Sequence, residues 1–96
     1  MRVSKNSSVP NIAGALAGSL RSGDSENLDV MGVQCVYIAV KALLLLSPFL
    51  KPNGIKPMIE ITPIDVKVGK NEVERTVIRF TIHPVPIGDS NGDEEE

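Results

Sequence analysis

The stretch Arg2-Val3-Ser4-Lys5-Asn6-Ser7-Ser8-Val9-Pro10-Asn11 leads from a short apolar segment through a polar turn into a helix. Ser7 and Ser8 are preferred N-cap residues, and Pro10 suits the first helical turn because its missing N–H would have no partner there. The pattern therefore predicts a strand at 3–5 followed by a capped helix. This strand-turn-helix order is the first half of a two-layer domain in which helices cover one face of a sheet.

The same turn gathers groups that bind anions. It combines backbone N–H groups, hydroxyls, side-chain amides and one ammonium group, and phosphate is the expected guest of such a turn. The candidate residues are Lys5, Asn6, Ser7, Ser8 and Asn11. The alternative is an ordinary helix start with one solvated lysine, and the local sequence taken alone favours that alternative.

The first helix is expected to run from Val9 to Ser22, because its apolar residues recur at helical spacing. Gly14 and Gly18 lie four residues apart within it. A glycine costs a helix about 1 kcal/mol relative to alanine. The pair therefore predicts close packing of this helix against a neighbouring element.

A second helix is expected from Val33 to Leu46, ended by Ser47-Pro48. Lys41 is the only charged residue between Gln34 and Phe49. A helix that is apolar nearly all round must be covered nearly all round, whereas a two-layer domain covers one side of it. We therefore expect a second copy of the chain on its exposed side. The candidate dimer-interface residues are Tyr37, Lys41, Leu44 and Leu45.

Three further strands are predicted from alternating apolar residues. They span Leu28 to Met31, Ile59 to Val68 and Val73 to His83, with a hairpin turn at Gly69-Lys70-Asn71. The alternation changes parity across Thr62-Pro63, which predicts a bulge or bend there and an edge or interrupted position for that strand. The element order is β-α-β-α-β-β. Right-handed crossovers then give an α+β (α/β two-layer) fold, with a four-stranded mixed sheet and two helices on one face.

Composition and charge divide the chain into a mildly basic domain and an acidic tail. Residues 89–96 hold five of the twelve acidic residues and no basic one, which leaves ten basic against seven acidic residues in 1–88. We therefore expect one domain at 1–86 and a disordered acidic tail at 87–96. Only 3% of the residues are aromatic, which argues against nucleic-acid binding by base stacking.

Features of secreted, membrane and metal-binding proteins are not evident in the sequence. Cys35 is the single cysteine, so an intrachain disulfide and a thiolate metal site are excluded. The N-terminus lacks the apolar core of a signal peptide, and the run from Ala42 to Leu46 is too short to span a bilayer. We expect a cytoplasmic protein, with nucleus or nucleoid also compatible, that is not secreted and has no membrane partner.

Catalytic motifs are also not evident. His83 stands alone near the end of a strand, and Cys35 lies among valines, where it is expected to act as a small buried hydrophobe. The sequence contains no phosphate-binding glycine fingerprint and no metal-ligand spacing. We expect a protein that is not an enzyme and that uses neither a cofactor nor a small-molecule substrate.

Several segments together resemble one protein family. They are Val3-Ser4-Lys5, Ile12-Ala13-Gly14-Ala15-Leu16-Ala17-Gly18, Gly32 followed by Ala39-Val40-Lys41-Ala42, and Glu74-Arg75-Thr76. In this order they resemble the stage V sporulation protein S family, within the Alba superfamily of small nucleic-acid-binding proteins. The resemblance implies an Alba-like fold, a homodimer or larger oligomer, and binding of DNA or RNA. For the sporulation family it implies a regulatory role.

The resemblance also implies which elements contact nucleic acid. Alba-type relatives use a lysine in the turn after the first strand, the start of the second helix and the basic hairpin between the last strands. The matching positions here are Lys5, Gln34, Lys67, Lys70 and Arg75. Together with Asn71, the hairpin residues could form a flexible arm along a groove; the alternative is a solvated hairpin.

The chain departs from that pattern in three places. The second helix begins without a basic residue, Glu72 and Glu74 dilute the charge of the hairpin, and the acidic tail is additional. Arg79 could extend the basic surface, but we expect it to pair with Glu60 or Asp65 across the sheet.

Two functions remain open from the sequence. The first is a dimeric regulator that binds nucleic acid through its backbone more than its bases. The second is a protein–protein interaction module that keeps the fold without a nucleic-acid surface.

Overall fold

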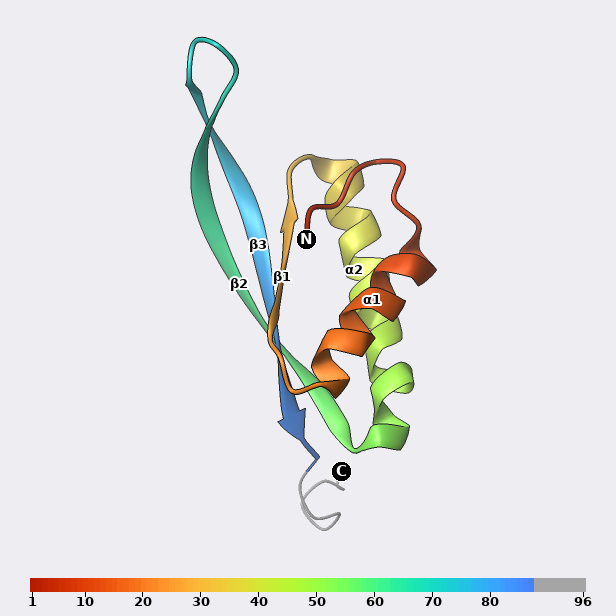
Figure 1. Cartoon of the computed structure of the whole chain (residues 1–96). Helices are drawn as coiled ribbons and strands as arrows, with labels where there is room; N and C mark the ends of the chain where they lie inside the picture. The colour runs from red at the N-terminus through yellow and green to blue at the C-terminus, as the bar shows by residue number, and fades with distance from the viewer. Residues whose placement is uncertain (88–96) are drawn as a thin grey trace.

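The computed structural model describes residues 1–87 of the chain as two helices packed on one face of a three-stranded antiparallel sheet, in the strand order β1-β3-β2 (Figure 1). The elements in chain order are α1 (Val9–Arg21), β1 (Glu26–Val30), α2 (Val33–Leu50), the short 3-10 helix η1 (Lys51–Asn53), β2 (Ile55–Val68) and β3 (Val73–Pro86). The α+β class with both helices on one face is therefore confirmed. The prediction of a four-stranded mixed sheet with Alba-like topology is wrong in its strand count and strand directions.

The expected first strand is reduced to a single bridge beside β1. Arg2 pairs with Asp29 in parallel, and the two backbone bonds there are Val3 N to Asp29 O (3.1 Å) and Asp29 N to Met1 O (2.9 Å). The chain then turns at once, because the N–H of Ser7 donates to the carbonyl oxygen of Ser4 (3.0 Å). The segment covers the outer edge of β1 but is too short to make a fourth strand.

Helix α1 begins as the sequence predicts. Ser8 is its N-cap, and its side chain accepts a hydrogen bond from the N–H of Asn11. Its buried residues, Ile12, Ala13, Leu16, Ala17 and Leu20, face the core. Gly14 and Gly18 lie on the opposite side, where an added Cβ atom would have nothing within 4 Å. The prediction that these glycines allow close packing is therefore wrong.

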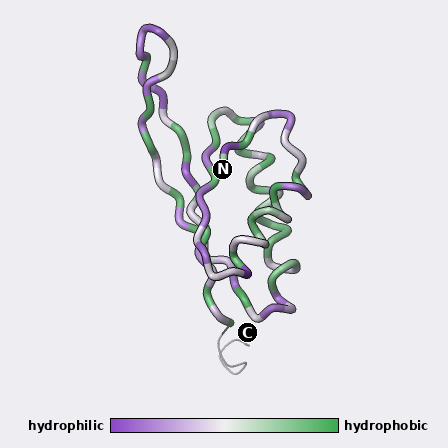
Figure 2. Tube along the Cα trace, viewed as in Figure 1, coloured by the Kyte–Doolittle hydropathy of each residue, from purple (hydrophilic) through white to green (hydrophobic). Residues whose placement is uncertain are grey.

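Helix α2 continues past Pro48 to Leu50, so the predicted end at Ser47-Pro48 is wrong. A proline removes one backbone hydrogen bond from a helix. The fully buried Leu50 holds the last turn against the core. The segment Val33–Asn53 is long and apolar enough to cross a membrane by length and composition, and much of α2 has the colour of hydrophobic residues in Figure 2. However, five α2 residues are buried in the domain core, and a core helix meets the same criterion.

Strands β2 and β3 pair in one unbroken antiparallel register, from Ile55 opposite Pro86 to Val68 opposite Val73. The bulge predicted at Thr62-Pro63 is therefore wrong, whereas the predicted edge position of this strand is confirmed. The parity change has another cause. Ile59 and Ile61 lie on the helix side, and Ile64 faces away from the helices beside its partner Val77.

The far end of the β2–β3 hairpin projects beyond the rest of the molecule (Figure 1). Strand β1 accompanies β3 only as far as Ile78, so residues 64–77 form a two-stranded arm. The molecule measures 54 × 24 × 23 Å, with a radius of gyration of 15.1 Å. A compact chain of this length has a radius of gyration of about 12.5 Å. The arm accounts for the elongated shape.

The exposed glycines of α1 lead to a stability prediction. Gly14→Ala and Gly18→Ala are each expected to raise the free energy of unfolding by about 0.5–1 kcal/mol, because alanine is the better helix former and its methyl group meets no neighbour. Urea denaturation measures the change. Gly23→Ala is the control and is expected to destabilise, since Gly23 has a φ of +88° after the helix. A loss of stability in both helical variants would contradict the prediction.

Candidate functional site

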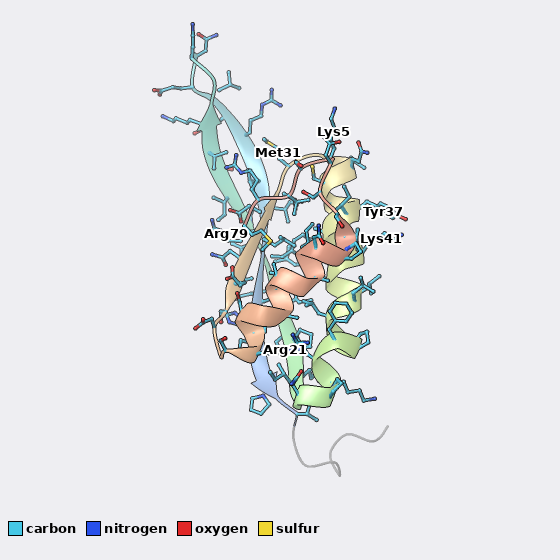
Figure 3. The ribbon with its side chains drawn as sticks, turned by 45° about the vertical axis from the view of Figure 1, so that its right-hand side comes forward. Lys5, Arg21, Met31, Tyr37, Lys41 and Arg79 are labelled. Atoms are coloured by element: carbon cyan, nitrogen blue, oxygen red, sulfur yellow. The ribbon has the colours of Figure 1, made fainter. Side chains whose placement is uncertain are left out.

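Three elements that the sequence associates with nucleic acid lie toward one end of the molecule (Figures 1 and 3). The turn that carries Lys5 lies at the same end of the helical layer as the N-terminus of α2. The arm projects toward this end as well. The fold therefore brings Lys5 and the N-terminus of α2, which carries Gln34, to the same end of the helical layer, and the arm extends beyond that end.

The Lys5 turn uses much of its own hydrogen-bonding capacity internally. Ser7 Oγ accepts a hydrogen bond from the backbone N–H of Ser4 (2.9 Å), and the N–H of Asn6 donates to Ser4 Oγ (3.3 Å). Ser4 Oγ and Ser7 Oγ also lie 3.2 Å apart. These bonds fix the shape of the turn. The hydroxyl of Ser7 is therefore less available to an anion than the sequence suggests.

The N-terminus of α1 is similarly occupied. Ser8 Oγ accepts from the N–H of Asn11 (3.4 Å), and Pro10 has no N–H to offer. Few backbone donors of this helix remain for a phosphate. The exposed ammonium group of Lys5 is the main attraction for an anion at this turn.

The N-terminus of α2 is more open than that of α1. Its N-cap is Gly32, with a φ of +98°, and no side chain caps it by a hydrogen bond. The first backbone N–H groups of a helix have no partner within the helix. Val33 and Gln34 are exposed at this end, and Cys35 is half-buried against the core. The uncapped donors and the positive end of the helix dipole make this a better phosphate site than α1.

The arm carries no net charge. Residues 64–77 contain three basic and three acidic residues. Lys67 Nζ lies 3.8 Å from Glu72 Oε1, and Lys67 also stands opposite Glu74 in the strand register. Lys70 and Asn71 lie in the exposed turn at the tip. The predicted basic arm is thus locally compensated, with Lys70 in its most accessible position.

Arg79 pairs with a carboxylate that the sequence did not suggest. Its Nε donates to Asp29 Oδ1 (2.7 Å) and its Nη2 donates to Asp29 Oδ2 (2.9 Å), across β3 and β1. The hydrogen bonds from Arg79, with its positive charge, hold the pKa of Asp29 below its usual value despite partial burial. The expectation that Arg79 is paired is confirmed, but the expected partners Glu60 and Asp65 are wrong.

A row of polar side chains on the face away from the helices was missed from the sequence. His83 Nδ1 lies 2.8 Å from Ser25 Oγ, and His83 Nε2 lies 3.2 Å from Glu60 Oε1. A hydroxyl, an imidazole and a carboxylate in a row can activate a nucleophile. The five cavities described here among residues 1–87 are lined by other residues. The contact of His83 with Glu60 links β3 to β2, and its contact with Ser25 links β3 to the segment before β1.

The exposed side of α2 is apolar, and three of the four predicted interface residues lie on it. Tyr37 and Leu44 are 63% and 70% exposed, and Lys41 Nζ lies 5.2 Å from the centre of the Tyr37 ring (Figure 3). Leu45 is instead half-buried against the core of its own chain. Sequence spacing alone did not separate Leu45 from Leu44.

An open apolar groove lies between α2 and β2. It has a volume of about 430 Å³, and its walls include Val40 and Leu44 from α2 and Ile59 and Ile61 from β2. Phe80 of β3 lies at the boundary with the core. Residues distant in sequence thus form one apolar surface.

Comparison with known families now adds to this geometry. The family described as Stage V sporulation protein S matches residues 1–85. The chain belongs to the stage V sporulation protein S family. The match covers both helices, β1, β2, the arm and all but the last residue of β3. The resemblance to this family is therefore confirmed, and the chain is a small sporulation-type regulatory protein by family membership.

The Asp29–Arg79 pair of this family member predicts an acid-sensitive contribution to stability. Because the folded-state pKa of Asp29 lies below its unfolded value of about 3.9, the pair stabilises the fold above about pH 4 and this contribution is lost as the pH falls through the folded-state pKa. Asp29→Asn is expected to be less stable than wild type at pH 7, with the difference shrinking toward pH 2.

Urea midpoints measured between pH 2 and pH 7 test this expectation. Asp65→Asn is the matched control, because Asp65 lies on the exposed arm and accepts one hydrogen bond from Thr76. A constant difference between wild type and Asp29→Asn over the whole pH range would contradict the prediction.

Proposed function

We propose that this protein is a dimeric, cytoplasmic regulator that binds DNA or RNA mainly through phosphate groups. The observation that carries the proposal is the uncapped N-terminus of α2 at the same end of the molecule as Lys5. A phosphate oxygen there meets backbone N–H groups, the positive end of a helix dipole and one ammonium group. Such contacts position a nucleic acid without reading its sequence.

The division of work among the candidate residues follows from their surroundings. Lys5 and the backbone near Gln34 form the primary phosphate contact. Lys70 and Asn71, at the exposed tip of the arm, reach a second point along the backbone. Lys67 contributes less, since Glu72 lies 3.8 Å from it. The low aromatic content supports backbone contact over base stacking.

A dimer improves weak phosphate binding. Two copies present two Lys5 turns and two arms, so the second contact forms within a bound complex at a high effective concentration. The exposed apolar side of α2, which carries Tyr37, Lys41 and Leu44, supports a homodimer. The net positive charge of 1–88, about one per thirty residues, favours salt-sensitive binding to phosphate groups.

The acidic tail was predicted to be disordered at 87–96, and of these residues 88–96 lie outside the described residues.

The second candidate function is a protein–protein interaction module with the same fold. The neutral arm and the apolar groove between α2 and β2 favour it. Association through apolar surface persists as salt rises, whereas phosphate contacts are lost. Salt dependence therefore separates the two functions.

Binding of labelled duplex DNA, single-stranded DNA and RNA tests the proposal, with salt varied. Lys5→Ala is expected to weaken binding and to lower the slope of log affinity against log salt by about one, because one phosphate contact is lost. Lys51→Ala is the matched control: Lys51 is also exposed, but it follows the C-terminal end of α2, away from the proposed contact.

The triple variant Lys5→Ala/Lys70→Ala/Arg75→Ala is expected to lose salt-sensitive binding altogether. Equal losses for Lys5→Ala and Lys51→Ala would contradict the proposed surface. An absence of binding at low salt, with residues 89–96 deleted as well, would contradict nucleic-acid binding and favour the interaction module.

A further inference from the structure

The outer edge of β2 is open, and the hydrogen bonds of the other strands determine which of its residues face outward. Asp29 of β1 directs its backbone N–H and carbonyl oxygen to the N-terminal segment, so the backbone groups of Leu28 and Val30 are directed to β3. The backbone groups of their partners Phe80 and Ile78 are then directed to β1, and those of the odd-numbered residues of β3 to β2. These odd-numbered residues stand opposite even-numbered residues of β2, so the odd-numbered residues of β2 direct their N–H and carbonyl groups away from β3, toward the open edge.

Two prolines limit this edge. Pro57 and Pro63 are odd-numbered and lack an N–H, so they occupy the outward positions without weakening the ladder with β3. Between them, Ile59 and Ile61 present outward N–H and carbonyl groups. Among residues 1–87, the backbone hydrogen bonds outside the helices and strands involve neither Ile59 nor Ile61. The prolines therefore leave a short pairing window at 58–62.

The side chains of the same two residues are apolar and exposed. Ile59 is 41% exposed and Ile61 66% exposed, and both line the groove with Val40 and Leu44 of α2. Unpaired strand edges of this kind readily pair with another strand. The window thus combines free backbone groups with an adjacent apolar surface, which fits a strand that carries apolar side chains on one face.

A second copy of β2 fits this window in one register. When two β2 strands run antiparallel around Glu60, Ile59 of each copy stands opposite Ile61 of the other, and each of these pairs can exchange both backbone hydrogen bonds. Pro57 then stands opposite Pro63. A register shifted by one pair of residues places a proline against Ile59 or Ile61 and removes a donor from the window. The edge is therefore complementary to itself about Glu60.

We propose that two copies of this chain join through antiparallel pairing of β2 around Glu60, which makes a continuous six-stranded sheet with the α2 grooves facing each other. This inference rests on the homodimer in the proposed function and names its interface. It does not depend on nucleic-acid binding. A two-fold axis requires the same patch on both copies, and the window meets that requirement.

The register places the two Glu60 side chains directly opposite each other at the axis, on the face away from the helices. Like charges directly opposite across two strands are destabilising. His83 lies 3.2 Å from the carboxylate of Glu60 within each copy and offers it a local partner. Exchange of one Glu60 for a cation should therefore convert a repulsive pair into an attractive one.

Mixing experiments test the register. Glu60→Lys mixed with mass-labelled wild type is expected to form the mixed dimer in excess of the random proportion, measured by native mass spectrometry. Glu60→Gln without wild type is expected to form a tighter homodimer than the wild-type chain does. A random proportion of mixed dimers, with no change for Glu60→Gln, would overturn the register.

A second pair of variants tests the edge itself. Ile61→Lys is expected to weaken the dimer about tenfold or more, since it places a charge in the apolar groove beside the window. The adjacent Thr62→Lys is expected to change the dimer by less than about threefold, since its side chain lies on the opposite face of the sheet. Thr62 is the matched control because its backbone groups are directed to β3 and its side chain lies on the face of the sheet away from the helices. Sedimentation equilibrium measures the dimer, and circular dichroism verifies that each variant folds.

The outcomes separate this inference from the proposed function. If the dimer survives Ile61→Lys but is lost in Leu44→Lys, the homodimer of the proposed function stands and the pairing of β2 is overturned. A wild-type chain that remains monomeric at all concentrations overturns both. Nucleic-acid binding is measured separately on the same variants.

Discussion

The pairing of β2 with β3 is the constraint on which the rest of the structure depends. Fourteen residues on each strand stay in one register, with Pro57 and Pro63 at positions where a missing N–H costs the ladder nothing. This register places Ile61 and Ile59 beside Phe80 and Ile82 on the helix side of the sheet. On its other side, β3 pairs with β1, which places Arg79 opposite Asp29. A shift by one residue would exchange the two faces of the sheet. The core, the arm and the open edge are therefore consequences of one alignment.

The helices cover only part of this long hairpin. Helix α1 and helix α2 bury a core built from leucine, alanine and valine over the half of the sheet that β1 accompanies. Beyond Ile78, β1 no longer accompanies the two strands, so most residues of the arm are exposed, whereas Val77 at its base is buried. Beside α2, the outward side of β2 is left with exposed isoleucines. The same shortage of covering elements thus creates both an extended arm and an apolar groove.

Several basic side chains have partners within their own chain. Arg79 is bound to Asp29, the exposed Lys67 lies near Glu72, and Arg21 donates to the side chain of Asn53 and to the carbonyl oxygen of Phe49. Near one end of the molecule lie Lys5, the tip of the arm and the uncapped N-terminus of α2. This distribution favours a few phosphate contacts over a broad basic surface.

The amino-acid sequence by itself determined the local elements. The Ser8 cap, the helical spacing of Ile12, Leu16 and Leu20, and the turn at Gly69 depend on neighbours in the chain, and family membership follows from the same local segments. The edge position of β2 could also be predicted, because proline constrains a strand wherever it lies. Of the candidate site, the exposed Lys5 and the hairpin tip were identifiable in this way.

Tertiary structure alone decided which distant groups meet. The first strand became a single bridge because the Ser4 turn closes too early. Arg79 pairs with Asp29 instead of Glu60 because β3 lies between β1 and β2 and can pair across either side. Leu44 is exposed and Leu45 half-buried because α1 packs on one side of α2 only. Strand order and helix coverage depend on long-range packing, and no local pattern of residues specifies them.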